Sequence, residues 1–267
     1  GRPLAVLIHG LTGCEASIYV VRAALVLLRA GYPVLRLNLR GAGPSRHTSS
    51  GFYHAGLTGD LRAFFAELSA PLRENGVVAL GYSLGGNLLL KYLGEEGPAA
   101  PLIAGIAVSA PADLAATAAR FHQLRNALYH RWLLARLKAE ALATGGAISE
   151  SERAVICDVR SCVEFDDRFV APRHGFAGVD DYYRRSSALR YLAAVRVPTL
   201  VIHALNDPWI PAAWLDGVDW RGNGNLVPLI ASGGGHVGFH GRGDRTAWHD
   251  RCTLSFLDDV LGSRRAA

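Results

Sequence analysis

The sequence lacks methionine altogether and contains only four cysteines in 267 residues. So few cysteines do not make a disulfide framework, and the one close pair, Cys157 and Cys162, has no second pair to complete a zinc site, so we expect reduced thiols.

No apolar run reaches the roughly 18 residues that a membrane span requires, and we expect a cytoplasmic protein without a transmembrane segment in this chain. Because the chain opens beside an apolar run and has no methionine, we also expect residues upstream of Gly1, so that an anchor or a peripheral membrane contact stays possible.

Long runs of one charge are also missing, although the formal net charge is +5. The positive charge is almost all arginine and is scattered, since the longest basic runs are the pairs Arg184-Arg185 and Arg264-Arg265. This scatter argues against a nucleic-acid partner. With 50% hydrophobic and 19% charged residues, the chain can bury a sizeable core, which excludes a disordered protein.

Short, continuous apolar runs recur along the chain, with helical stretches between them. Continuous runs indicate strands that are buried on both faces, as in a parallel sheet covered by crossover helices. The sequence therefore predicts an α/β fold with a mostly parallel central sheet. The predicted strands are Leu4 to Ile8, Val34 to Leu39, Val77 to Leu80, Leu102 to Val108, Thr199 to Ala204 and Asn225 to Ile230.

Two early stretches have helix signals: Ser17 to Ala30 ends at a glycine, and Thr58 to Leu68 opens with a possible cap. The interval from 112 to 195 is too long for a structureless loop, and its segment Phe121 to Ala143 has a helical composition. We predict one α/β core, 1–111 and 196–267, with a helical cap or lid inserted over 112–195.

The strongest functional signal is the G-x-S-x-G sequence Gly81 to Gly85, between a predicted strand and a helical run that begins at Gly86. In a nucleophile elbow the serine occupies a strained tight turn that raises its hydroxyl above the sheet edge, and the flanking glycines avoid clashes. This context predicts Ser83 as a nucleophile. The alternative is a glycine-rich turn with an unreactive serine.

A serine nucleophile requires a base and an acid, which follow it in the order acid then histidine in this type of fold. Asp207 follows one predicted strand and His236 follows the next, on a glycine-rich loop, so all three side chains are expected at one sheet edge. Asp113 is a rival acid and His240 a rival base. The spacing of His236 and His240 also permits a zinc site, but the glutamate and helix of a zinc protease motif are missing.

Acyl transfer also requires two donors for the developing oxyanion. We expect the backbone N–H groups of Leu84, after the nucleophile, and of Leu11, in the loop after the first strand. His9, at the end of that strand, is a second rival base, but its position favours a hydrogen-bonded core residue that shapes the loop. We likewise expect a structural role for His54.

Together these motifs resemble the α/β-hydrolase superfamily, and within it the YheT-like branch, also called the AB hydrolase 4 family. The similarity extends from about Leu4 to Phe239 and is weakest between Phe121 and Phe169. Members usually carry residues before Leu4, including two leading strands that are missing here. The motifs that carry the resemblance are His9 to Gly13, Asn38 to Gly41, Tyr53 to Gly56 with Asp60, Gly81 to Asn87, Ser109 to Leu114, Asn206 to Pro208 and Gly234 to Phe239.

The resemblance implies a serine-dependent carboxylic ester hydrolase with Ser83 as nucleophile, His236 as base, Asp207 as its orienting acid, and no cofactor. The expected partner is a small-molecule or lipid ester. An acyltransferase with the same triad and a non-catalytic binding protein of the same fold are the alternatives. Aromatic residues that could line an acyl site are Tyr82, Phe121, Trp132, Phe165, Phe169, Phe176 and Trp209.

Overall fold

A computed structural model describes residues 1–143 and 148–266 of the chain. Its centre is a six-stranded sheet with the strand order β2-β1-β3-β4-β5-β6, and every neighbouring pair is parallel. The predicted α/β class is confirmed, and each of the six predicted strands is present. Their bounds are β1 Leu4–Ile8, β2 Val34–Leu37, β3 Val77–Tyr82, β4 Ala104–Val108, β5 Thr199–Ala204 and β6 Leu226–Ala231.

Side chains alternate between two apolar layers along the strands, one on each face of the sheet. In β1, Ala5 and Leu7 face the layer that contains α1 (Ile18–Arg29) and α11 (Trp248–Ala266). Val6 and Ile8 face the layer that contains α2 (Thr58–Glu67) and α4 (Leu84–Glu96). Helices therefore cover both faces of the sheet, which explains why the strands are continuous apolar runs.

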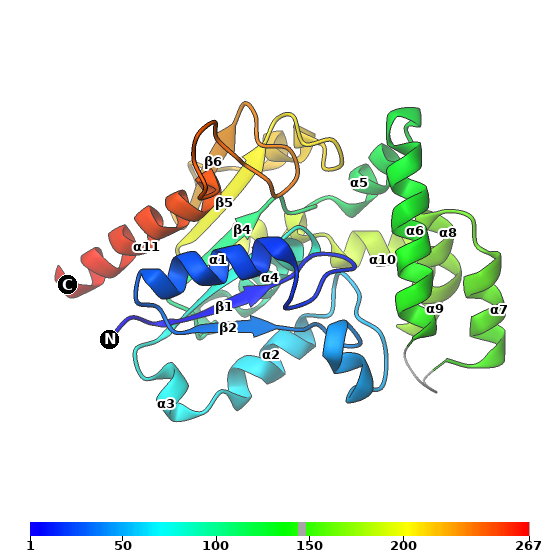
Figure 1. Cartoon of the computed structure of the whole chain (residues 1–267), viewed down its shortest axis with the longest axis horizontal. Coiled ribbons are helices and arrows are strands. Elements are labelled where there is room, and N and C mark those ends of the chain that lie inside the picture. Colours follow the sequence, from blue (N-terminus) through cyan, green and yellow to red (C-terminus); the bar gives the residue numbers. More distant parts are fainter. Residues whose placement is uncertain (144–147, 267) are drawn as a thin grey trace.

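Most of the remaining helices lie in the connection between β4 and β5. In Figure 1 they gather at the right, beyond the carboxyl ends of the strands, while both termini lie at the left. The α-helices of this connection are α5 Leu114–Phe121, α6 Ala127–Leu142, α7 Glu150–Asp158, α8 Cys162–Phe165, α9 Ala171–Arg173 and α10 Val179–Ser186. Shorter helical segments in it are η3 Leu124–Asn126, the π-helix η4 Asp166–Val170 and η5 Ala188–Ala194.

We refer to residues 112–143 and 148–195, the described part of the predicted insertion, as the cap. The predicted helical segment Phe121 to Ala143 is divided in the structure, because α5 ends at Phe121 and α6 begins only at Ala127. The last segment of the cap, η5, packs along α4 of the core. Elsewhere the short helices are α3 Ala70–Arg73, η1 Gly43–His47, η2 Gly97–Ala99 and η6 Ala212–Gly217.

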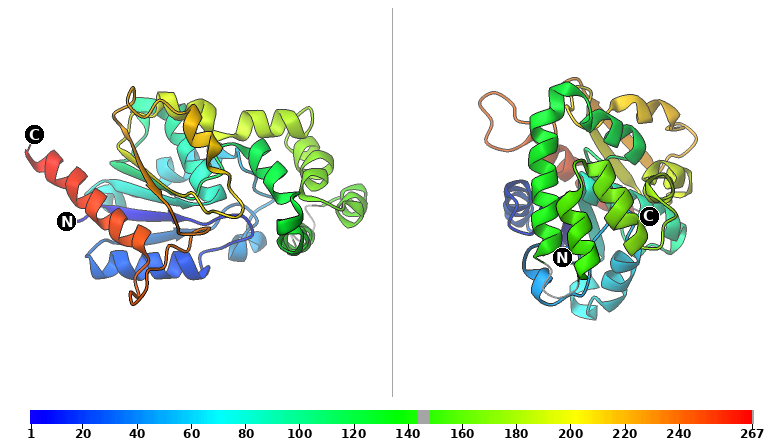
Figure 2. Two further views of the ribbon diagram at one scale, coloured as in Figure 1. Left: turned by 90° about the horizontal axis from the view of Figure 1, so that it is seen from above. Right: turned by 90° about the vertical axis from the view of Figure 1, so that its right-hand side faces the viewer.

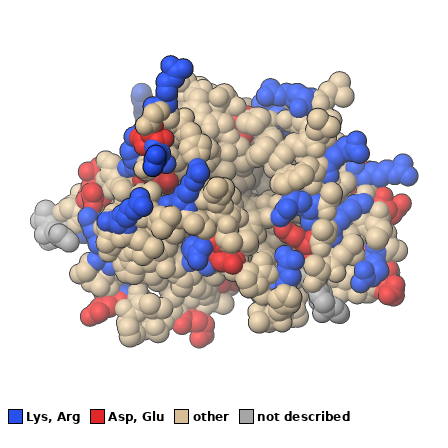
Figure 3. Space-filling model, in the orientation of Figure 1, with Lys and Arg blue, Asp and Glu red and all other residues tan. Residues whose placement is uncertain are grey.

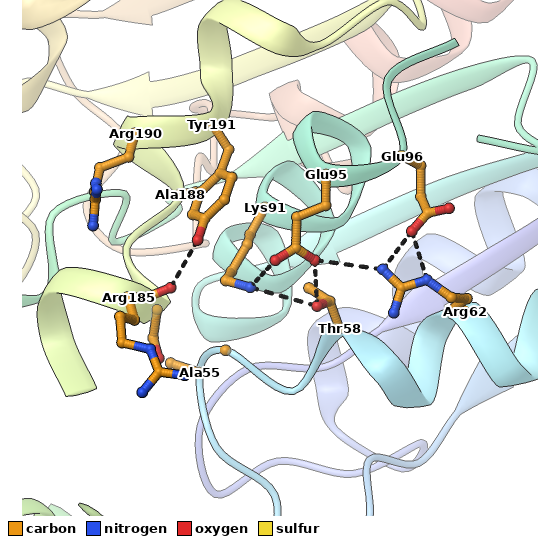
Figure 4. A network of polar contacts seen from close by, with 12 residues as sticks. Ala55, Thr58, Arg62, Lys91, Glu95, Glu96, Arg185, Ala188, Arg190 and Tyr191 are labelled. Atoms are coloured by element: carbon orange, nitrogen blue, oxygen red, sulfur yellow. Dashed lines mark hydrogen bonds and ion pairs between the residues drawn. The ribbon is translucent and has the colours of Figure 1, made fainter. Parts of the chain in front are cut away.

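A polar network joins α2, α4 and η5 on one side of the sheet (Figure 4). The prediction that Thr58 is the N-cap residue of its helix is wrong. Thr58 is the first residue of α2, and its hydroxyl donates to Glu95 instead of to the helix backbone. Lys91, which is buried, forms an ion pair with Glu95 and lies 4.9 Å from the ring centre of Tyr191 in η5. The network thus fixes α2 and the end of the cap to the helix that follows the predicted nucleophile.

Among the helices of residues 1–143 and 148–266, none is both long enough and apolar enough to cross a bilayer.

Candidate active site

Ser83 occupies the sharp turn between β3 and α4. Its backbone has φ +51° and ψ −121°, a left-handed conformation that is strained for a residue with a Cβ atom. The turn is held on both sides, since the Ser83 N–H donates to the carbonyl of Val108 at 2.8 Å and the Ser83 carbonyl accepts from the Asn87 N–H at 3.0 Å. Strain at an otherwise well-bonded turn is the geometry of a nucleophile elbow.

Glycines on both sides of Ser83 permit this turn to pack closely. A Cβ atom at Gly81 would lie 2.3 Å from the carbonyl oxygen of Gly85, and one at Gly85 would lie 2.4 Å from the carbonyl oxygen of His9. A side chain at either position would therefore push α4 away from the ends of β3 or β1. The predicted reason for these two glycines agrees with the packing.

The sheet brings Ser83, His236 and Asp207 together at the carboxyl ends of β3, β6 and β5. Nε2 of His236 lies 3.0 Å from the Ser83 hydroxyl, and its Nδ1 lies 2.8 Å from the Asp207 carboxylate. The Asp207 side chain is fully buried and that of His236 is 9% exposed. Chemically, a hydroxyl, an imidazole and a carboxylate in this sequence of contacts can transfer a proton away from the hydroxyl.

Asp207 is held in place by its own turn. One of its oxygens accepts the N–H groups of Trp209 and Ile210 at 2.9 and 3.0 Å, which leaves the other for His236. These three bonds satisfy the carboxylate without any solvent contact. The Asp207 side chain therefore both shapes its own turn and contacts His236.

The loop that carries His236 is braced by Asn206, a role that sequence reasoning missed. Its side-chain oxygen accepts the N–H groups of Gly234 and Gly235 at 3.0 and 2.9 Å. Gly234 also has no room for a side chain, because a Cβ atom there would lie 2.4 Å from the Phe239 ring. Asn206 immediately precedes Asp207 in the sequence, so one turn positions both the acid and the loop of the base. The position of Asn206 directly before Asp207 was the sequence signal from which its role could have been predicted.

The two expected oxyanion donors come from adjoining segments, Leu11 from the loop after β1 and Leu84 from the turn of Ser83. A Cβ atom at Gly10 would lie 3.0 Å from the Cβ of Ser83, so the loop after β1 touches the nucleophile turn. Both leucines line the cavity described below. β2 and β3 lie on opposite sides of β1, so the connections after β1 and before β3 run to different sides of the sheet. Ligand-binding sites of α/β proteins commonly form at such a switch point.

The hydrogen bonds of the loop after β1 leave one N–H free. The N–H of Gly10 donates to the Tyr19 hydroxyl at 2.8 Å, that of Thr12 to the Tyr53 hydroxyl at 2.7 Å, and that of Gly13 to the Gly10 carbonyl. Within residues 1–143 and 148–266, the Leu11 N–H has no acceptor. Leu84 is the first residue of α4, where helical N–H groups also lack partners. Both N–H groups are therefore available to an oxyanion.

The rival residues have other contacts. Both ring nitrogens of His9 are engaged, since Nδ1 lies 2.8 Å from the Gly10 carbonyl and Nε2 accepts the Leu39 N–H at 3.1 Å. Burial lowers the pKa of His9 to about 4, so it is a neutral bridge between the ends of β1 and β2. Asp113 caps α5 by accepting the Ala116 N–H, and His240 is exposed.

A cavity of about 500 Å³ lies between the Ser83 turn and the cap, and its wall is mainly apolar. Phe121, Trp132, Phe165 and Trp209 line it as expected. Tyr82, Phe169 and Phe176 do not, and Tyr82 packs in the layer on the α1 side of the sheet. Aromatic residues of the wall that sequence reasoning did not single out as cavity residues are Tyr19, Phe52, Tyr53, Tyr129, Tyr182 and Tyr183.

Asp166 and His54 are among the groups in the cavity wall whose pKa values are strongly shifted. Burial raises the pKa of Asp166, which accepts a hydrogen bond from the Tyr183 hydroxyl at 2.7 Å, to about 7. Burial, with a smaller effect of the neighbouring His174, lowers the pKa of His54 to about 3. Nδ1 of His54 accepts the N–H of Gly56 at 3.1 Å, so this histidine shapes its own loop.

Known proteins resemble the chain in sequence and in fold. It matches the alpha/beta hydrolase family over residues 5–247. YheT of Escherichia coli (strain K12), whose name gives a provisional esterase assignment, is 34% identical over 90% of this chain and 71% of YheT. Phospholipase ABHD3 of Mus musculus is 27% identical over 97% of this chain, which spans only 62% of that relative's length. The solved esterase Pf2001 of Pyrococcus furiosus superposes with a TM-score of 0.63 and 17% identity, over 97% of this chain and 83% of that one. The chain belongs to the alpha/beta hydrolase family, in its YheT-like branch.

Proposed function

We propose that this protein hydrolyses carboxylic esters through an acyl-enzyme intermediate on Ser83. The observation that supports this most directly is the pair of contacts at His236, 3.0 Å to the Ser83 hydroxyl and 2.8 Å to the Asp207 carboxylate. A neutral imidazole that is oriented by a buried carboxylate is the base that a serine hydroxyl requires at neutral pH.

In the first half-reaction, the Ser83 oxygen attacks the ester carbonyl as its proton passes to Nε2 of His236. The negative charge of the tetrahedral intermediate is stabilised by the N–H groups of Leu11 and Leu84. His236 then gives the proton to the departing alcohol oxygen, which leaves an ester of Ser83. Asp207 keeps the Nδ1 proton in place and stabilises the charged imidazole.

In the second half-reaction, water attacks the acyl-enzyme and loses its proton to His236. The acid is released, and the proton returns to Ser83, so atoms and protons balance over the cycle. Besides the ester and water, the cycle uses Ser83, His236, Asp207 and the two backbone N–H groups.

The cavity supports an ester with an apolar acyl group as the substrate. Its wall combines the aromatic rings of the cap with aliphatic side chains such as Leu133, Leu137 and Val170. A volume of about 500 Å³ lies within the usual range for small-ligand sites. We expect the activity on p-nitrophenyl esters to rise with acyl length from acetate and then to fall once the chain exceeds the cavity.

The test uses Ser83→Ala with Ser255→Ala, on the exposed face of α11, as its matched control. Ser83→Ala should lower kcat/KM for a p-nitrophenyl ester by at least about 1,000-fold, whereas the control should retain the wild-type value. A fluorophosphonate probe should label the wild-type protein at Ser83, as read by peptide mass spectrometry. Full activity in Ser83→Ala would overturn the proposal, and an unlabelled, inactive wild-type protein would favour a binding role. Accumulation of transferred acyl product with added alcohols would indicate an acyltransferase.

A further inference from the structure

A row of large apolar side chains is exposed to solvent along the outer side of the cap. Leu124 is 94% exposed, Leu128 is 82% exposed and Trp132 is 51% exposed. They follow one another at four-residue intervals through η3 and α6, which places them on one face. We call these three residues the apolar ridge. The right-hand view of Figure 2 shows α6 running along the outer surface of the cap.

The surroundings of the apolar ridge are positively charged. Arg125, Arg131 and Arg136 are all exposed, and none of them forms an ion pair with any carboxylate that the structure describes. The one acidic residue between positions 124 and 142 is Glu140, which is buried. Figure 3, in the orientation of Figure 1, shows Lys and Arg side chains on both sides of a central hollow, with a smaller number of Asp and Glu side chains among them. An exposed apolar row with unpaired arginines beside it is complementary to an anionic amphiphilic surface.

The apolar ridge is continuous with the mouth of the cavity. Trp132 is both exposed and part of the cavity wall, and so is Ile18, at the start of α1, which is 67% exposed. Two exposed apolar side chains from separate elements therefore border the opening. A surface that covered the ridge would also cover the mouth.

A chain of aromatic ring contacts connects the ridge with His236. The Trp132 ring lies 5.5 Å from that of Tyr129, and Tyr129 stacks on Trp209 at 3.7 Å with nearly parallel planes. The Trp209 ring in turn lies 4.7 Å from the imidazole of His236. The exposed face of α6 is thus part of the same packed unit as the candidate active site.

We propose that this face of the cap docks on an anionic phospholipid surface. The apolar ridge enters the boundary between head groups and acyl chains, and Arg125, Arg131 and Arg136 lie at the level of the phosphates. A second copy of the chain fits less well, because a symmetric contact through the ridge would bring the arginines of both copies together. The docking itself does not require hydrolysis, whereas its use for delivering a substrate rests on the proposed function.

The test measures binding of the full chain to vesicles of phosphatidylcholine, alone and mixed with phosphatidylglycerol, by co-sedimentation. The wild-type protein should bind the mixed vesicles and release them at high salt. The double variant Leu124→Ser/Leu128→Ser should bind at least about tenfold more weakly, because the apolar surface of two leucines is no longer transferred from water into the membrane. Neither leucine lines the cavity, so turnover of a soluble p-nitrophenyl ester should not change. The matched control is Leu25→Ser/Leu28→Ser on α1, where the same residues are 47% and 54% exposed.

A second pair tests the charge. Arg125→Gln/Arg131→Gln should weaken binding to the mixed vesicles by about tenfold or more, because each arginine near an anionic surface adds to the attraction. Arg22→Gln/Arg29→Gln, also exposed and on α1, should bind as the wild-type protein does. Light scattering on the same samples gives the oligomeric state.

Three results would overturn the proposal: no binding by the wild-type protein, equal loss in the α1 controls, or a wild-type dimer that dissociates in Leu124→Ser/Leu128→Ser. The last result would assign the ridge to a second copy of the chain. Ridge-dependent binding in a protein that hydrolyses no ester would support docking and refute the proposed function, so the two failures are distinguishable.

Discussion

The Tyr53 hydroxyl donates to Glu140 at 3.3 Å, a bond that links the loop before α2 to helix α6 of the cap. The same hydroxyl accepts the Thr12 N–H at 2.7 Å. Burial raises the pKa of Glu140 and, more strongly, that of Tyr53, so the phenol stays protonated and available as a donor. One side chain therefore connects the cap to the loop that carries the Leu11 N–H.

Removing this hydroxyl should affect the chemical step more than binding. In Tyr53→Phe the Thr12 N–H loses its acceptor, so the loop after β1 no longer holds the Leu11 N–H as rigidly. We expect kcat for a soluble ester to fall about tenfold, less than the loss of a donor itself, and KM to change little. The free energy of unfolding should fall by about 1–2 kcal/mol.

Tyr92→Phe is the control for this prediction. Tyr92 is a buried tyrosine that packs against Phe65, and its hydroxyl makes no hydrogen bond to any residue that the structure describes. Its removal should leave kcat unchanged. An equal fall of kcat in both variants would show that the Tyr53 bond has no special role.

The two glycines Gly85 and Gly59 should respond in opposite ways to the same added methyl group. A Cβ atom at Gly85 would overlap the carbonyl oxygens of His9 and Ile8, at 2.4 and 2.6 Å, whereas one at Gly59 in α2 meets nothing within 4 Å. Gly85→Ala should lose about 1–3 kcal/mol of stability and most of the esterase activity. Gly59→Ala should be equally stable or more stable by up to about 1 kcal/mol. Urea denaturation and ester turnover measure both; a stable, active Gly85→Ala would contradict the close packing of α4 on β1.

Asn87 should stabilise the junction between the core and the end of the cap. Its fully buried amide donates to the carbonyls of Ala55 and Ser186 and accepts the Ala188 N–H, all within 3.0 Å. Asn87→Ala leaves three buried backbone groups unpaired, and we expect a loss of about 2–4 kcal/mol in urea denaturation. Asn75→Ala, at an exposed position, should change stability by less than about 0.5 kcal/mol. Equal stability of the two variants would mean that water replaces the lost bonds.

Asp166 should make the protein less stable as the pH rises. Its pKa is about 7 when folded and near 3.8 when unfolded, so between these values the folded state binds the extra proton and stability falls with increasing pH. Asp166→Asn cannot lose a proton there, and the decrease in Tm from pH 5 to pH 8 should be smaller than in the wild-type protein. Asp250, whose pKa burial also raises to about 7, preserves part of the decrease. An unchanged pH profile in Asp166→Asn would show that the Asp166 carboxyl is ionised at little cost.

The parts of the site that the sequence predicts are those defined by short local patterns. The strand, glycine and helix signals around Ser83 all lie within a few residues of it, and Asp207 follows its strand directly. Tyr53 had no comparable signal, because its partner Glu140 is 87 residues away. Thr58 was assigned wrongly for the same reason, since its hydroxyl binds a glutamate on another helix. Composition likewise could not show that Tyr82 packs away from the cavity, on the α1 side of the sheet.

Ser83 and His236 are separated by 153 residues, and only the completed sheet joins them. During translation the elbow leaves the ribosome long before β6 and the loop that carries His236. On the proposed mechanism, a nascent chain thus holds a serine that has no base and cannot attack esters in its surroundings. The order of synthesis itself delays the reactive form until β6 and the loop of His236 have been made.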